Sequence, residues 1–249
     1  MKKFLFLFYL FSIAGYAQLV SGELVYKADF LLDKYEEGRS KNNVAGSDGG
    51  LENALKNHIL KENQALEYIE FVLIFNQNES FFTQKNKSMA VDSGLDFKFV
   101  IASLKAEGEY YLNLKENQSI YQSKKLDRNW LVIDQLKEFD WELTSETKVI
   151  QGYTCYKAIT KYANSSKKSS EVVAWYAPDI PFRFGPIEYS GLPGLILELE
   201  QGNYRFYAEK LTFDTKKKNI KPPTKGEKHT RDSYETKIKE INHRLRGGA

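Results

Sequence analysis

The chain has 249 residues, of which 42% are hydrophobic, 14% aromatic and 28% charged, a balance typical of a folded, β-rich domain. Its net charge of +3 is too small to indicate a nucleic-acid partner, and the single cysteine, Cys155, excludes an internal disulfide framework. From Thr215 to the end, eleven Lys or Arg face four Asp or Glu, so the tail is basic and the remainder mildly acidic.

The N-terminus has the pattern of a secretory signal peptide. Met1 to Lys3 are basic at two positions, Phe4 to Ile13 are almost all apolar, and Ala14 to Ala17 supply small residues for cleavage before Gln18. About ten apolar residues are too few for a spanning helix, which needs roughly 20. We therefore predict that residues 1–17 are removed and that the mature protein is exported to the periplasm, the outer membrane or the medium. No cysteine follows the cleavage site, so a lipoprotein is not indicated, and no transmembrane segment is expected after signal removal.

The N-terminal half alternates between strand and helix patterns. We expect a strand over 19–32, an exposed loop over 33–50, a helix over 51–64, and a strand over 65–76 that pairs with 79–86 through the turn 76–78. Residues 87–109 are expected to hold loops and a short helical segment.

Regular short strands fill the region from Glu109 to Asp214, and the last two form a hairpin around Gln201-Gly202. We predict one α+β domain, mainly antiparallel β, over residues 18–214. Its sheet is expected to be strongly curved or an open barrel, with one helix from the N-terminal half and one C-terminal helix packed on it.

The basic tail divides in two. Residues 215–229 contain Pro222-Pro223 and are predicted to be a linker, because proline blocks regular structure. Residues 230–249 are predicted to hold an amphipathic helix with Thr230 as N-cap and one apolar stripe, formed by Tyr234, Ile238, Ile241 and Leu245.

The stretch Leu192-Pro193-Gly194-Leu195 predicts a tight turn. Proline suits the second position of a type II turn, and Gly194 the third, where φ is positive. In the strand that follows, we expect the leucines to face inward and Ile196, Glu198 and Glu200 to face outward.

Three ordered segments, 146–158, 174–186 and 189–199, resemble the GLPGLI family of exported proteins, found chiefly in Bacteroidota. The residues that carry the resemblance, and that we expect to have a structural role, are Pro181, Gly185, Pro186, Gly191, Leu192, Pro193, Gly194, Leu195 and Ile196. The resemblance implies a signal peptide, a mostly β domain and an envelope location. It implies no activity and no catalytic residues.

The sequence contains no clear motif for catalysis or for binding a metal or cofactor. A nucleophilic cysteine needs a base and a lowered pKa, and the spacing of His58, His229 and His243 does not suggest that any of them meets Cys155. We expect Cys155 to be a buried free thiol. The sequence contains no metal-binding spacing, phosphate-binding loop or nucleophile elbow, so no metal and no cofactor is expected.

The proline-rich segment 174–194 is the best candidate for a binding surface. Its rings and one cation could form an aromatic lip, or the rings could cap one end of the core; the candidate residues are Trp175, Tyr176, Phe182, Arg183, Phe184 and Tyr189. The leading hypothesis is a non-enzymatic binding or carrier module for an apolar or peptide ligand. The alternatives are an accessory subunit that docks on an outer-membrane protein and, third, a hydrolase.

Overall fold

The computed structural model describes residues 20–41, 49–85, 97–163, 169–245 and 247. The predicted signal peptide lies outside these residues. The elements are β1 (Ser21–Phe30), α1 (Leu32–Lys41), α2 (Gly49–Glu67), β2 (Phe71–Asn76), β3 (Glu79–Gln84), α3 (Phe97–Ser103), β4 (Glu109–Asn113), β5 (Gln118–Lys125), β6 (Arg128–Gln135), β7 (Glu142–Ile150), β8 (Tyr153–Ala163), β9 (Ser169–Ala177), β10 (Leu195–Gln201), β11 (Tyr204–Asp214), β12 (Glu227–His229) and α4 (Arg231–Leu245).

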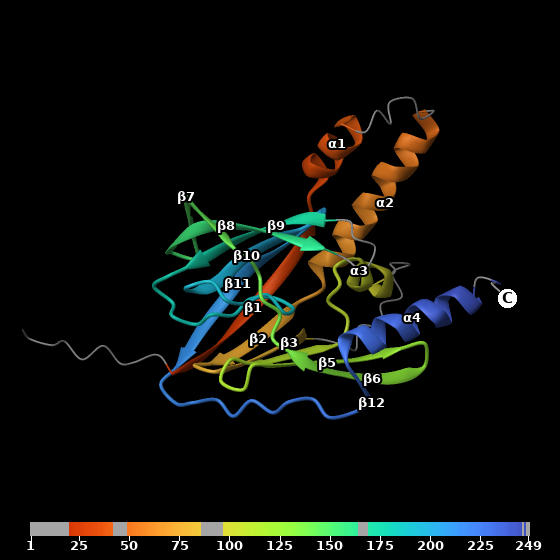
Figure 1. The fold of residues 1–249 in the computed structure, drawn as a ribbon. Coiled ribbons are helices and arrows are strands. Elements are labelled where there is room, and N and C mark those ends of the chain that lie inside the picture. The colour runs from red at the N-terminus through yellow and green to blue at the C-terminus, as the bar shows by residue number, and fades with distance from the viewer. Residues whose placement is uncertain (1–19, 42–48, 86–96, 164–168, 246, 248–249) are drawn as a thin grey trace, which may run out of the picture.

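The strands form one twisted sheet in the order β12-β6-β5-β4-β3-β2-β1-β11-β10-β9-β8-β7 (Figure 1). Neighbouring strands are antiparallel except β12, which runs parallel to β6. The mainly antiparallel α+β class is therefore confirmed. Because β12 and β7 end the sheet without pairing to each other, the described sheet is open and not a barrel.

The first strand, β1, lies in the middle of the sheet between β2 and β11. Leu24, Tyr26 and Ala28 alternate along it and are buried, as the period of two in a strand requires. The hydroxyl of Tyr26 donates a hydrogen bond to the carbonyl of Ile196. This bond ties the centre of the sheet to the GLPGLI-like stretch.

Both predicted hairpins are present. In the β2–β3 turn, the side-chain oxygen of Asn76 accepts hydrogen bonds from the amides of Asn78 and Glu79, at 2.9 Å each. In the β10–β11 turn, Gly202 takes a φ of +60°, which glycine adopts without strain.

Helix α1 corrects one expectation, because part of the predicted loop after β1 is helical. The amide of Tyr35 bonds to the carbonyl of Leu31 at 3.1 Å, and the ring of Tyr35 lies 5.7 Å from that of Phe30. Lys34 also pairs with Glu200 on β10, at 3.3 Å. These tertiary contacts stabilise a polar turn whose composition alone favours a loop. The helix predicted in the N-terminal half is α2, which lies against β1, and α3 follows in the predicted short helical region.

Residues 215–229, which we call the strap, are packed against the sheet, whereas a linker was predicted here. The strap runs along the outer face of β2 to β6, and its last residues form β12 (Figure 1). Ile220 is buried with Tyr111, Ile120 and Leu131 in a small apolar cluster, separate from the main core. Pro222-Pro223 do exclude regular structure, but extended chain can still pack on a sheet.

Helix α4 begins as predicted, with the hydroxyl of Thr230 accepting a hydrogen bond from the amide of Ser233 at 3.3 Å. Tyr234 packs on the buried Trp130, with ring centroids 5.3 Å apart. The rest of the apolar stripe is only half-buried, and Leu245 is 70% exposed. The first turns of α4 therefore hold it to the sheet.

None of the helices in the described ranges is both long and apolar enough to cross a membrane.

Candidate functional site

The segment between β9 and β10, residues 178–194, packs into the main core, where Phe182 lies against Phe75 of β2. Phe184 and Ser190 form an isolated bridge, and between them the amide of Tyr189 bonds to the carbonyl of Pro186 at 3.1 Å. Inside this turn, Ile187 takes a φ of +60°, which is a strained conformation for a β-branched residue. The bridge on either side holds the strained turn in place.

The glycines of this segment are needed mainly because of close packing. Gly194 is absent from the residues with positive φ, so the predicted type II turn at this position is wrong. A Cβ on Gly194 would instead lie 2.2 Å from the carbonyl oxygen of Ala177, and a Cβ on Gly185 would lie 2.6 Å from the side chain of Ile196. The positive φ falls on Gly191, at +97°.

The strand after the turn is buried on both faces, which corrects the expected one-sided pattern. Ile196 is covered by the 178–194 segment, whose Phe184 carbonyl accepts its amide at 3.0 Å. Glu198 is only 6% exposed because Lys148 lies over it, with Nζ 2.6 Å from Oε1. Of the three predicted outward residues, only Glu200 is more than 9% exposed.

Four of the six candidate binding residues are buried, so the open aromatic lip is not formed. Tyr176, Phe182, Phe184 and Tyr189 are at most 5% exposed and cap the core, the alternative that the sequence left open. Trp175 is half-buried under the ammonium group of Lys148, which lies 4.2 Å from its ring. Arg183 is exposed and donates a hydrogen bond to the carbonyl of Gly191 at 2.8 Å.

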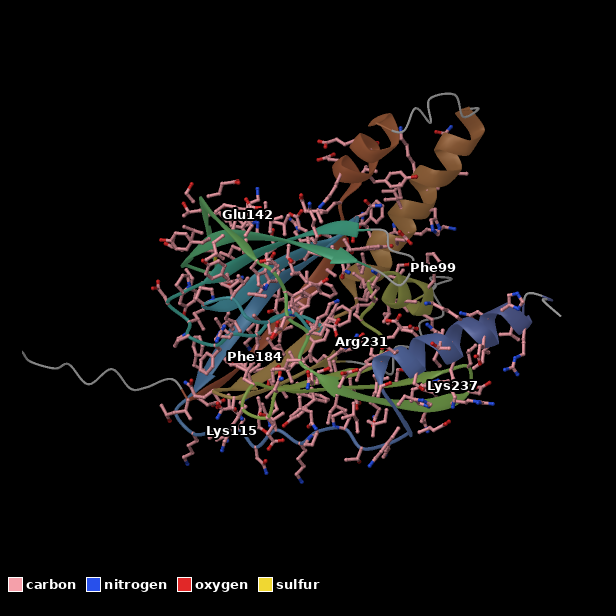
Figure 2. The ribbon with its side chains drawn as sticks, in the orientation of Figure 1. Phe99, Lys115, Glu142, Phe184, Arg231 and Lys237 are labelled. Atoms are coloured by element: carbon pink, nitrogen blue, oxygen red, sulfur yellow. The ribbon has the colours of Figure 1, made fainter. Side chains whose placement is uncertain are left out.

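The strained turn places Glu188 against α4. The carboxylate of Glu188, 8% exposed, lies 2.6 Å from Nη2 of Arg231 and 3.7 Å from Nζ of Lys137 (Figure 2 labels Arg231). Burial lowers the pKa of Lys137, and Glu188 opposes that change. Two cations thus compensate one buried carboxylate.

Arg231 is held by its position at the start of α4. Its backbone amide bonds to the carboxylate of Asp134 at 3.1 Å, one residue after the N-cap Thr230. The guanidinium therefore projects from a fixed helix start, where it joins the 178–194 segment to α4.

A pocket of about 220 Å³ lies beside this pair. Its walls come from the end of α3, strands β4 to β6, the strained turn and α4; the lining residues are Ala102, Lys105, Glu107, Tyr110, Tyr121, Lys125, Val132, Ile187, Glu188, Tyr189, Gln201, Arg231, Tyr234 and Glu235. A smaller hollow of about 150 Å³ shares Lys105 and Gln201 with the first and continues to Tyr204. The two neighbouring hollows are together named the α3–α4 groove.

Three tyrosines give the groove its aromatic wall. The rings of Tyr110 and Tyr121 lie 4.8 Å apart, and those of Tyr121 and Tyr234 lie 6.0 Å apart. Burial, followed by the neighbouring Tyr121 and Glu188, raises the pKa of Tyr110 well above its ordinary value. Burial also raises the pKa of Tyr121. These hydroxyls stay protonated at neutral pH and act as hydrogen-bond donors, as Tyr110 does to the carbonyl of Lys105 at 2.7 Å.

Cys155 is fully buried, as expected of a small core residue. Burial raises the pKa of its thiol to about 11, and the bond to the backbone of Ile150 and the charge of Lys148 only partly oppose this. The thiolate is therefore a minor species at neutral pH, which is unfavourable for nucleophilic chemistry. Across the described parts of the chain, no three His, Cys, Asp or Glu side chains gather as a metal site.

Of the groove residues, Tyr189 alone was a candidate binding residue from the sequence. Glu188, an acid between the apolar residues Ile187 and Tyr189 in the segment 174–194, was a usable signal. No sequence signal marked Tyr110 on β4, Tyr121 on β5 or Lys105 after α3, because these residues come close to α4 only through strand pairing.

A family described as "Protein of unknown function (Porph_ging)" matches residues 160–198, which include the GLPGLI-like stretch. Two solved structures of PNGF-II, in space groups P21 and C2, are similar to this chain, with TM-scores of 0.52 and 0.53 and identities of 15% and 16%. Each match covers 89% of this chain and 33% of the PNGF-II chain, so this chain spans about a third of PNGF-II. No curated protein matches the sequence. The likeness to PNGF-II supports the fold, and the resemblance to the GLPGLI family remains an expectation.

Proposed function

We propose that this chain is a non-enzymatic binding module that holds a short peptide in the α3–α4 groove. The observation that carries the proposal is the buried Glu188–Arg231 pair at the wall of a groove whose lining includes the neighbouring rings of Tyr110, Tyr121 and Tyr234. A strained backbone position beside a pocket is a recurrent feature of ligand sites, and Ile187 supplies one here.

The lining favours a peptide over an acyl chain. The lining combines three cations with three carboxylates beside the tyrosine rings: Lys105, Lys125 and Arg231, and Glu107, Glu188 and Glu235. Such walls offer donors and acceptors to peptide amides and apolar surface to side chains, whereas an acyl chain would dehydrate the charged groups and offer them no hydrogen bond. Each hollow, at about 220 Å³ and about 150 Å³, is smaller than about 300 Å³, the lower end of the range for ligand pockets, which limits the ligand to a few residues.

The chemical groups in and around the groove favour ligand binding over catalysis. The only nucleophilic thiol, Cys155, is buried and protonated, and it is absent from the groove lining. The carboxylate of Glu188 is engaged by two cations, Arg231 at 2.6 Å and Lys137 at 3.7 Å, so it is committed to an ion pair in the wall of the groove.

The proposal is tested by affinity selection from a mixture of tetrapeptides, read by mass spectrometry. Ala102→Trp places a large ring in the groove from an exposed position on α3 and should reduce peptide retention at least ten-fold. Phe99→Trp, on the same helix but outside the lining, is the matched control and should retain peptides like the natural chain. Retention of no peptide by the natural chain, or equal retention by Ala102→Trp, would overturn the proposal.

A further inference from the structure

We propose that the strap is a docking surface for an anionic lipid bilayer. This site is separate from the α3–α4 groove, and the inference does not depend on what the groove binds.

The strap is held in a fixed path along the sheet. The carbonyl of Lys216 accepts a hydrogen bond from the hydroxyl of Ser21 at 2.7 Å, and the carbonyl of Lys218 accepts one from the side-chain amide of Asn76 at 3.2 Å. The backbone amide of Lys225 donates to the side-chain oxygen of Gln122 at 2.6 Å. Ile220 and Pro223 point inward and are buried. Because the apolar residues and the backbone groups bind the sheet, the remaining side chains of the strap face away from it.

Those side chains are mostly lysines. The strap contains six lysines and one glutamate. Lys217 pairs with Glu79 at 3.6 Å, and Lys218 pairs with Asp214 at 3.2 Å and Glu23 at 3.6 Å. The single acid of the strap, Glu227, is itself bound by Lys237 from α4, at 2.9 Å.

Four lysines of the strap are left to face a partner: Lys216, Lys221, Lys225 and Lys228. Each is exposed, and within the described part of the chain no carboxylate lies at ion-pair distance from any of them. They are spread over at most about 40 Å of extended chain. These exposed positive charges are carried by a backbone that is hydrogen-bonded to the sheet, which a flexible linker would not provide.

A lipid surface fits these charges better than a nucleic acid does. Sites for single-stranded nucleic acid interleave cations with aromatic rings that stack on bases, and the strap contains no aromatic ring other than the buried His229. An anionic bilayer needs only cations close to its surface, and each contributes about a five-fold gain in binding. The strap exposes no large apolar side chain, so the contact is electrostatic and peripheral.

Docking in this way would leave the groove accessible. Adjacent residues of β4 lie on opposite faces: Tyr111 packs with Ile220 under the strap, whereas Tyr110 lines the groove. A chain bound to a membrane by its strap would therefore present the α3–α4 groove away from the lipid.

The test is flotation with vesicles at low salt, which uses the mature chain. The natural protein should bind vesicles that contain 30% phosphatidylglycerol and should not bind pure phosphatidylcholine. The quadruple variant K216Q/K221Q/K225Q/K228Q should lose at least ten-fold in binding to the anionic vesicles. Its thermal unfolding should stay unchanged, because the four side chains are exposed.

The matched control removes the same charge elsewhere. K61Q/K98Q/K161Q/K239Q changes four exposed lysines on α2, α3, β8 and α4, and should bind anionic vesicles almost as the natural chain does. An equal loss in both variants would mean that net charge alone acts, and would overturn the proposal. So would an absence of binding by the natural chain, or strap-dependent binding to heparin without binding to vesicles.

Discussion

The carboxylate of Glu188 and the guanidinium of Arg231 lie 2.6 Å apart, although 43 residues separate them in the chain. The pair joins the GLPGLI-like region to the C-terminal helix at the wall of the α3–α4 groove.

Arg231→Met should destabilise the protein, because it leaves a buried carboxylate with only Lys137 nearby. Breaking a fully buried pair costs about 3–5 kcal/mol; since about a third of the Arg231 side chain is exposed, we expect about 2 kcal/mol here. Denaturant unfolding measures the change. The double variant E188Q/R231M should lose less than the single one, since no charge is then left unpaired. A single variant within 0.5 kcal/mol of the natural chain would show that the pair is solvated.

Gly194→Ala should cost about 1–3 kcal/mol, because the new Cβ would meet the carbonyl oxygen of Ala177 at 2.2 Å. Gly50→Ala, on α2, is the control: its Cβ meets nothing within 4 Å, so the change should be neutral or stabilising. Thermal unfolding of both variants measures the difference in their stability. Equal stability of the two would contradict the close approach of the β9 and β10 ends.

Much of the fold was predictable from local pattern. The alternation of apolar and polar residues predicted most strands. Asn76 and Gly202 indicated two turns, and Thr230 indicated the start of α4. The position of β1 beside β11 was not predictable, because that pairing spans almost the whole domain and depends on packing. The burial of Glu198 was missed for the same reason, since Lys148, which covers it, comes from a strand 50 residues earlier.

The aromatic wall of the α3–α4 groove was not predictable from the sequence. Tyr110, Tyr121 and Tyr234 look like ordinary strand and helix residues, and only the sheet order and the strap bring them together. The aromatic residues of 174–194 were the stronger signal, and four of them are core residues. Because these four rings are buried, they stabilise the core.

Thr230→Ala should cost about 1 kcal/mol, because the amide of Ser233 loses its capping partner. Thr230→Ser keeps the hydroxyl and should restore most of the stability. Since α4 carries Arg231 and Tyr234, Thr230→Ala should also weaken ligand retention in the groove. Hydrogen exchange in the first turn of α4 measures fraying; unchanged protection there would argue against the cap.

Cys155 should react slowly with iodoacetamide in the folded protein and rapidly after unfolding. Burial raises the pKa of the folded thiol to about 11, above the ordinary 9.0. The folded state therefore holds this proton more tightly than the unfolded state, and the resulting contribution to the free energy of unfolding is fully present below pH 9. It is lost as pH rises from 9 toward 11. The stability advantage of the natural chain over Cys155→Ala should therefore shrink over that interval. Rapid native alkylation at pH 7 would contradict the buried thiol.

Native mass spectrometry of the protein, purified gently from its own cells, tests the central claim most directly. We predict a retained mass equal to a peptide of a few residues, present on the natural chain and on Phe99→Trp and absent from Ala102→Trp. A retained lipid, or a peptide that stays bound when Ala102→Trp fills the groove, would contradict the assignment of the α3–α4 groove as a peptide site.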